Sequence, residues 1–324
     1  MKDDKKKLLS KTAYLYYIEN KTQNEIAEEL NIYRTTISRM LKQARDEGIV
    51  DITINNFDTD LFLLERHLKK KYKLKDIIIV PNHVDQDEKE KDNLLAKESA
   101  AYVRRIIKKN DVVGLAWGSS LANMAAKIEN FRMTNSIFVP LVGGPSHINS
   151  KYHVNTIAYD MARCFGGKSI FVNATVVQES EELRDGIINS RYFDEIKAYW
   201  EKIDIALVGI GGHLSEQTSK WRDLLTEEDR EDLKLREAVG DCCCQFFDEE
   251  GKILKGNLYN RTVSIPLERL QKVPYAIGIA RGEKKVRSIL AMLKRKYINV
   301  LVTDEETIVK MLKISKDPYY KDIK

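Results

Sequence analysis

The sequence predicts an α/β protein with a separate helical domain at its amino end, and three observations support this. Apolar residues in the first 48 positions recur at the spacing of amphipathic helices. From about Asp76 onward, short apolar runs alternate with helical segments, a pattern typical of a largely parallel sheet covered by helices on both faces. At 324 residues, the chain is too long for one small core and suggests two domains.

The stretch from Thr22 to Gly48 predicts two short helices joined by a tight turn. Thr22 is suited to cap the first helix, and Glu25 three residues later completes a capping-box pattern. Asn31 tolerates the left-handed backbone that a tight turn needs. The second helix begins near Arg34. Tyr33 stands where a serine-like cap is usual, so we expect the first turn of this helix to be less well capped.

The polar side chains of the second helix point to DNA. Hydroxyls and backbone amides near a helix start can bind phosphate oxygens, and an arginine can bind a guanine edge with two hydrogen bonds. The charges alone favour an ordinary helical hairpin with a solvated charged face, because such faces are common. The cap, the tight turn and the small Ala27 at the helix crossing favour a helix-turn-helix that reads DNA. The predicted DNA-binding residues are Thr22, Arg34, Thr35, Thr36, Ser38, Arg39 and Lys42.

The predicted DNA-binding domain spans residues 1–56. A helix over 8–20 would support the two-helix unit, and the alternating run over 49–54 predicts a short strand or wing. Residues 57–75 predict a linker and then a helix over 60–72. The leucine stripe of that helix would pack on its own domain or pair two subunits, because helix-turn-helix proteins usually read two half-sites as dimers.

The predicted α/β domain spans 76–316 and is followed by a polar tail, 317–324. Strands are expected at 77–80, 111–117, 137–141, 170–172, 205–210, 275–280 and 299–303. Ligands of such sheets bind beyond the carboxyl ends of the strands. Glycine-rich or basic turns follow four of these ends, at 118–120, 143–147, 209–213 and 281–285. Together they predict a site for an anionic small molecule, without the fingerprint of a dinucleotide-binding domain.

Composition excludes several other classes of protein. No apolar run approaches the roughly 20 residues of a membrane span, and the charged start has no signal-peptide core behind it. The adjacent Cys242, Cys243 and Cys244 lack the Cys-x-x-Cys spacing of a metal site, so zinc is the weaker alternative. We expect a reduced, cytoplasmic protein without bound metal. The net charge of +5 is mild, so the prediction of DNA binding depends on where the charges stand.

Seven motifs in this order resemble the SorC/DeoR-like sugar-binding transcriptional regulators, from about Ser10 to Leu312. They are the helix-turn-helix, WGSSLANMA, PLVGG, VGIGG, AVGDCCCQFFDEEG, GIARGEKKVRSI and NVLVTDEET. The resemblance implies a winged helix-turn-helix joined to a Rossmann-like effector domain related to sugar-phosphate isomerases and glucosamine-phosphate deaminases. It further implies a homo-tetramer or dimer that binds operator DNA of carbohydrate-metabolism genes. A phosphorylated sugar would control it, and no cofactor is expected.

The resemblance also implies an effector site. Residues 118–120 match a phosphate cradle, Lys285 matches a lysine that neutralises phosphate, and Asp241 matches an acid that accepts hydrogen bonds from ligand hydroxyls. Two glycines and a histidine after the third strand would line the pocket, and an asparagine would reach it from the next helix. The implied effector-binding residues are Gly118, Ser119, Ser120, Gly143, Gly144, His147, Asn155, Asp241 and Lys285.

Two features separate this chain from some relatives and from enzymes. Val142 occupies the place where some relatives carry a lysine that forms a Schiff base with an aldehyde sugar, so covalent capture there is excluded. The alternative function is an isomerase- or deaminase-like enzyme with an appended DNA-binding domain. Such an enzyme needs an acid and a base over the sugar. Asp241 and a weaker candidate, His147, make no clear pair, so we predict a regulator without catalytic residues.

Overall fold

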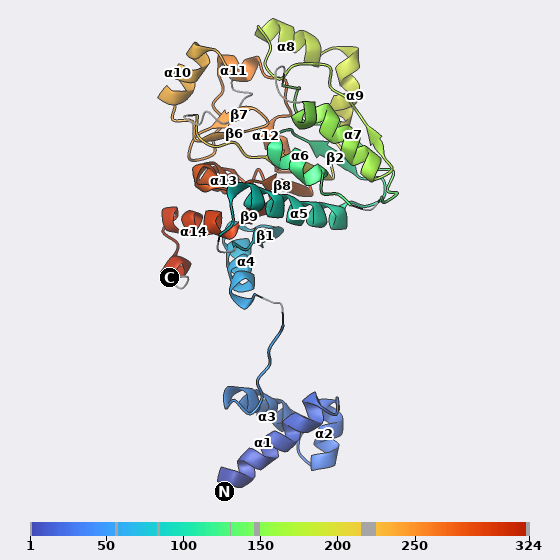
Figure 1. Ribbon diagram of the computed structural model, residues 1–324, viewed down its shortest axis with the longest axis vertical. Coiled ribbons are helices and arrows are strands. Elements are labelled where there is room, and N and C mark those ends of the chain that lie inside the picture. Colours follow the sequence, from blue (N-terminus) through green and yellow to red (C-terminus); the bar gives the residue numbers. More distant parts are fainter. Residues whose placement is uncertain are drawn as a thin grey trace. The chain divides into compact units, whose positions relative to one another are not determined.

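A computed structural model describes residues 2–55, 58–82, 85–129, 131–145, 150–214 and 225–321. The chain divides into two compact units, Met1–Thr59 and Asp60–Lys324 (Figure 1). In the described ranges, no helix is both long and apolar enough to cross a membrane.

The first unit consists of three helices in its described part. They are α1 (Lys2–Tyr17), α2 (Gln23–Leu30) and α3 (Arg34–Asp46). Leu15, Ile26, Ile37 and Leu41 form its buried core. All three predicted helices are present. The first begins earlier than expected, because the lysines before Leu8 are good helix formers and extend it into solvent.

The turn between α2 and α3 has the predicted chemistry. Thr22 and Glu25 form a reciprocal capping box, with the Thr22 N–H donating to Glu25 Oε2 at 2.7 Å and the Glu25 N–H donating to Thr22 Oγ1 at 3.3 Å. Asn31 lies in the left-handed region, at φ 52° and ψ 46°. Tyr33 caps α3 without a side-chain hydrogen bond, as predicted.

The predicted strand or wing over 49–54 is wrong. These residues form no strand, and the side chains of Ile52 and Ile54 are exposed. A lone extended segment has no partner for its backbone N–H and C=O groups, and the rest of the described unit is helical. The unit is therefore a three-helix helix-turn-helix domain without a wing in its described residues.

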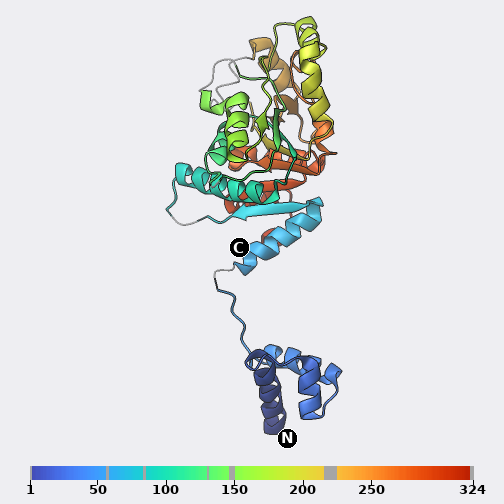
Figure 2. The same cartoon turned by 90° about the vertical axis from the view of Figure 1, so that its right-hand side faces the viewer.

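The second unit is built on a parallel sheet with helices packed against it (Figures 1 and 2). The sheet has seven strands in the order β1-β9-β8-β5-β2-β3-β4. β2 and β9 are buried along their whole length, as expected for a sheet covered on both faces. The strands are β1 (Asp76–Val80), β2 (Val112–Leu115), β3 (Ile137–Pro140), β4 (Lys168–Ser169), β5 (Ile205–Gly209), β8 (Tyr275–Ile279) and β9 (Val300–Asp304).

Six of the expected strands are present, and the one predicted at 170–172 is displaced to β4. The Ile170 N–H still donates to the carbonyl of Phe138, but the Asn155 amide then takes over both backbone groups of Val172. Its Nδ2 donates to the Val172 carbonyl and its Oδ1 accepts from the Val172 N–H, each at 2.9 Å. A side chain thus replaces the ladder partner that a longer strand would need.

Helices connect the strands and cover the sheet. The α-helices are α4 (Thr59–Tyr72), α5 (Glu88–Ile106), α6 (Ser119–Ala125), α7 (Val154–Cys164), α8 (Glu181–Ile188), α9 (Arg191–Trp200), α10 (Glu227–Leu235), α11 (Asn257–Asn260), α12 (Leu267–Leu270), α13 (Val286–Lys294) and α14 (Glu305–Ile314). Short 3-10 turns are η1 (Ser150–Tyr152), η3 (Glu283–Lys285) and η4 (Pro318–Lys321). A small antiparallel hairpin, β6 (Gly240–Cys242) and β7 (Gln245–Phe247), was not predicted.

Helix α4 packs on its own unit, one of the two alternatives for its leucine stripe. Leu64 and Leu68 are buried in the core of the α/β unit. The carboxylate of Asp317 accepts hydrogen bonds from His67 at 3.0 Å and from Lys71 at 2.5 Å, and the Tyr319 ring stacks on His67. The start of the predicted polar tail is therefore docked against α4. Pairing of subunits through this helix stays a prediction.

Candidate functional site

The strand order reverses between β2 and β5. The chain continues from β2 to β3 and β4 on one side, and from β5 to β8 and β9 on the other. Loops diverge at such a switch point and leave a crevice at the carboxyl ends of the strands. A cavity of about 130 Å³ lies there. It is lined by Ala116, Trp117, Gly118, Ser119, Ser120, Val142, Gly209, Ile210, Gly211, Asp241, Cys243, Cys244 and Lys285.

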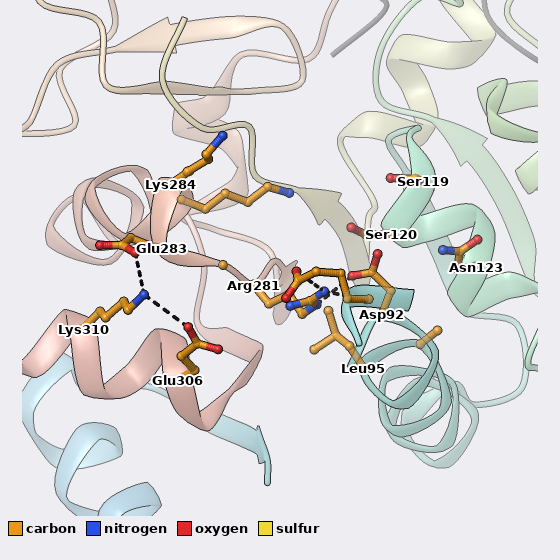
Figure 3. A pocket seen from close by; sticks show the side chains of 14 residues that line it. Asp92, Leu95, Ser119, Ser120, Asn123, Arg281, Glu283, Lys284, Glu306 and Lys310 are labelled. Carbon is orange, nitrogen blue, oxygen red and sulfur yellow. Dashed lines mark hydrogen bonds and ion pairs between the residues drawn. The ribbon is translucent and has the colours of Figure 1, made fainter. Parts of the chain in front are cut away.

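A larger cavity of about 490 Å³ shares Ser119, Ser120 and Lys285 with the smaller one, so the two form one cleft. Figure 3 shows Lys284, Glu283, Lys310 and Glu306 along one side of the larger cavity. The side chains of α6 lie along the other, and Arg281 and Asp92 lie between the two sides.

Five of the predicted effector-binding residues line the cleft, namely Gly118, Ser119, Ser120, Asp241 and Lys285. Gly118 precedes α6 with a φ of 119°, a conformation that favours glycine and turns the chain from β2 into the helix. The two serines then occupy the first turn of α6. Asp241 is buried in the β6–β7 hairpin, and Lys285 ends the loop that follows β8.

The structure does not bring Gly143, Gly144 or Asn155 to the cleft. Both glycines are buried behind it, where a Cβ on Gly143 would approach the Thr175 carbonyl oxygen to 2.7 Å. The Gly143 carbonyl accepts a hydrogen bond from the indole of Trp117, which does line the cleft. The Asn155 amide is occupied by Val172. His147 lies outside the described residues.

Sequence reasoning missed the β6–β7 hairpin as a wall of the smaller cavity. Cys243 and Cys244 form its loop, and the Gly211 N–H donates to the Asp241 carbonyl at 2.8 Å, which ties the hairpin to the loop after β5. A two-residue hairpin loop is usually predicted from Asn-Gly or a similar pair, whereas Cys-Cys does not predict a hairpin. The hydrogen-bonded Cys243 thiol, and then burial, raise the pKa of Cys242, so the Cys242 thiol stays protonated.

A network of ion pairs holds the mouth of the larger cavity. Arg281 pairs with Asp92 at 2.7 Å and with Glu88 at 2.9 Å. Burial by itself would lower the pKa of Arg281, but these two hydrogen-bonded carboxylates raise it. Lys310 pairs with Glu283 at 2.6 Å and with Glu306 at 3.2 Å. The hydrogen bond to Glu283 is the main reason that the pKa of Lys310 is raised. Arg281 and Lys310 are thus committed to carboxylates of the chain itself.

The smaller cavity offers little for acid–base catalysis or metal binding. Among the described residues that line the smaller cavity, Asp241 is the one carboxylate and no histidine is present. In the ranges that the structure covers, no group of three His, Cys, Asp or Glu side chains is placed to hold a metal ion. The arrangement is suited to binding a polar, anionic molecule through hydroxyls, an ammonium group and a carboxylate.

The first unit carries the other predicted site on α3. Ile37, Leu41 and Ala44 face the core, whereas the predicted contact residues of α3 face solvent, apart from the half-buried Thr36. The exposed ones are Arg34, Thr35, Ser38, Arg39 and Lys42. Thr22 is exposed and engaged in the cap of α2. One face of α3 therefore presents two arginines, a lysine and hydroxyls to a partner.

Known proteins resemble the chain along nearly its whole length. The family model described as "Putative sugar-binding domain" matches residues 58–313. The sorbitol operon regulator of Klebsiella pneumoniae is 36% identical over 309 residues, which cover 95% of this chain and 98% of that protein. The deoxyribonucleoside regulator of Bacillus subtilis is 31% identical over 314 residues, covering 95% and 97%.

Solved structures agree with these relatives. The full-length sorbitol operon regulator SorC from Klebsiella pneumoniae has a TM-score of 0.75 at 36% identity and covers 94% of this chain and 98% of its own. A transcriptional regulator from Streptococcus pneumoniae has a TM-score of 0.77 at 43% identity, covering 81% and 100%. Because these relatives are transcriptional regulators, the chain is a regulator and not an enzyme. It belongs to the SorC family of sugar-binding transcriptional regulators.

Proposed function

We propose that a phosphorylated sugar bound in the cleft controls the binding of operator DNA by α3. The observation that carries this proposal is the meeting of Ser119, Ser120 and Lys285 at the boundary shared by the two cavities. Hydroxyls and amides at a helix start hydrogen-bond phosphate oxygens, and a lysine neutralises their charge. Asp241 in the smaller cavity would accept hydrogen bonds from sugar hydroxyls.

The sizes of the cavities indicate how such a ligand would lie. Small-molecule sites are usually about 300–1,000 Å³, so the cavity of about 130 Å³ is too small by itself and the two cavities together are large enough. We infer that the sugar occupies the smaller cavity and that its phosphate lies at the shared boundary. Val142 lines the smaller cavity in place of a lysine, so the sugar is held there without a covalent bond to this position.

The DNA side of the proposal depends on the exposed face of α3. A recognition helix of this kind enters the major groove, and two half-sites are read by two copies. We therefore propose a homo-dimer or homo-tetramer on the operator. The exposed Phe62 and Leu63 on α4 offer apolar side chains that suit contact between copies.

Calorimetry with a panel of phosphorylated sugars and their unphosphorylated counterparts tests the proposal. Sorbitol 6-phosphate and deoxyribose 5-phosphate are chosen because two relatives are named as a sorbitol operon regulator and a deoxyribonucleoside regulator. Fructose 6-phosphate is a third probe. We expect a phosphorylated member to bind and its unphosphorylated counterpart to bind far more weakly. Lys285→Ala should weaken the phosphorylated ligand by about 10- to 100-fold, because a hydrogen bond to a charged group contributes about 1.5–3 kcal/mol.

Lys313→Ala is the matched control, since Lys313 is an exposed lysine on α14 that lines neither cavity. It should leave affinity unchanged. Full affinity of Lys285→Ala for every phosphorylated sugar that the native protein binds would mean that the phosphate is held elsewhere. Equal affinity for the phosphorylated and unphosphorylated forms would contradict the proposed ligand class.

A further inference from the structure

The loop of the β6–β7 hairpin has a backbone conformation that its residues rarely adopt. Cys242 lies opposite Gln245, so Cys243 and Cys244 form a two-residue loop. Their φ values are 50° and 60°, in the left-handed region that a type I′ turn requires at both positions. Asn and Gly are strongly favoured there, because a side chain makes this conformation costly. The sequence therefore departs from a local rule at two adjacent positions.

The same two residues line the smaller cavity, and each is only 5% exposed. A cysteine side chain behaves as a small, weakly polar group. With Val142 and Ile210, the thiols give the cavity an apolar part, whereas its hydrogen-bonding groups come from α6, Asp241 and Lys285. The residues that strain the turn thus also line the cavity.

Neighbouring groups hold the strained loop in place. Ser264 Oγ donates to the carbonyl of Cys243 at 2.9 Å, and Gln245 Nε2 donates to Ser264 Oγ at 3.0 Å and to the carbonyl of Ile265 at 2.6 Å. An unfavourable backbone persists only where the surroundings fix it, and such positions gather at ligand sites. These hydrogen bonds therefore hold a backbone conformation that by itself lowers the stability of the fold.

We propose that Cys243 and Cys244 determine which sugar phosphate the cleft accepts. The inference rests on the proposed function, in which the effector is a phosphorylated sugar. The thiol wall receives C–H groups of the sugar or of a deoxy position. A hydroxyl directed at this wall would exchange strong hydrogen bonds with water for weak ones with sulfur, which costs affinity. The cleft thereby selects between sugar phosphates that differ in one hydroxyl.

The test compares two substitutions that relieve the same backbone strain in the full-length protein. Cys244→Gly removes one thiol from the cavity. Lys296→Gly is the control, because Lys296 has a φ of 56°, is exposed and lines neither cavity. Lys296→Gly should raise the melting temperature of the ligand-free protein by about 1–4 °C. In Cys244→Gly, the same relief is offset by the lost packing of a buried side chain. Only Cys244→Gly should weaken the tightest-binding phosphorylated sugar of the panel, by about tenfold, while leaving the affinity for inorganic phosphate unchanged.

Cys243→Ser provides a second measurement that does not depend on folding stability. It keeps the size of the side chain nearly constant and offers a stronger hydrogen-bonding group. The ratio of affinities for a sugar phosphate and its deoxy analogue should shift about fivefold or more toward the hydroxylated ligand.

The outcomes separate this inference from the proposed function. Unchanged affinity of Cys244→Gly together with an unchanged ratio for Cys243→Ser would show that the thiols do not select the ligand. If the native protein binds no phosphorylated sugar of the panel, the proposed function fails first, and the assignment of the thiols fails with it.

Discussion

Substitution of Asp317 by asparagine should loosen α4, the helix that joins the α/β unit to the linker. The Asp317 side chain is only 1% exposed and contacts two residues of α4, the imidazole of His67 and the ammonium group of Lys71. The Tyr319 N–H donates to the same carboxylate at 2.9 Å. Asparagine has nearly the same shape, so the substitution removes the charge while it leaves the packing of η4 in place.

The expected cost follows from the ionisation of the carboxyl. Burial by itself would raise the pKa of Asp317, but the hydrogen bonds from His67, Lys71 and the Tyr319 amide lower it from 3.8 to about 2. This difference corresponds to about 2 kcal/mol in favour of the folded, ionised form. Because the folded-state pKa is the lower one, the stabilisation is complete above the unfolded value of 3.8 and is lost as the pH falls toward 2.

Hydrogen exchange and thermal unfolding at neutral pH measure the effect. Asp317→Asn should lower the melting temperature of the α/β unit by about 3–8 °C and speed amide exchange over residues 59–72. Lys69→Ala on the same helix is the control, because its pair with Asp76 is 3.6 Å long and exposed, so it should contribute less than about 0.5 kcal/mol. Native melting temperature and native protection of α4 in Asp317→Asn would refute this reasoning.

Three further outcomes test other parts of the molecule. Arg39→Ala should weaken operator binding by about 1–3 kcal/mol in a gel-shift assay and spare effector binding, because Arg39 is an exposed side chain of α3; native DNA affinity would contradict its role. Thr22→Ala should destabilise the first unit by about 0.5–2 kcal/mol in denaturant unfolding through loss of the capping box, and no change would contradict the cap. Arg261→Met should cost the α/β unit about 3–5 kcal/mol, since it leaves the buried Asp229 carboxylate without its partner at 2.8 Å; a neutral effect on denaturant unfolding would count against that pair.

Much of the fold could be predicted because the deciding interactions are local in the chain. The capping box joins Thr22 to Glu25, and the left-handed Asn31 is set by its own side chain and its neighbours. The buried strands are recognisable in the sequence as apolar runs, as at residues 77–80 and 205–209, because a strand covered on both faces must be apolar on both faces. The five cleft residues then follow from the rule that ligands lie beyond the carboxyl ends of parallel strands.

The rest depends on partners that are distant in sequence. The strand predicted at 170–172 ends early because Asn155, seventeen residues before Val172, takes its backbone groups. The hydrogen bond that holds α4 joins His67 to Asp317, about 250 positions later in the chain. Sequence periodicity gives no signal for such a distant pair. Likewise, Gly143 and Gly144 look like ligand turns in the sequence, although the structure uses them for close packing against Thr175 and His153.

Two local departures from sequence rules lie at the proposed binding surfaces, although others, such as the left-handed Glu237 and Lys296, line neither cavity. Tyr33 leaves the first turn of α3 without a side-chain cap, at the end of the helix where DNA phosphate would lie under the proposed function. Cys243 and Cys244 occupy a turn that favours Asn and Gly, at the wall of the effector cavity. Thr226 and Asp87, at the starts of α10 and α5, form regular capping boxes. A departure from local preference therefore does not mark a binding position by itself. It favours a role in binding only where a second observation agrees, as at Cys243 and Cys244, which also line the cavity beside Asp241 and Lys285.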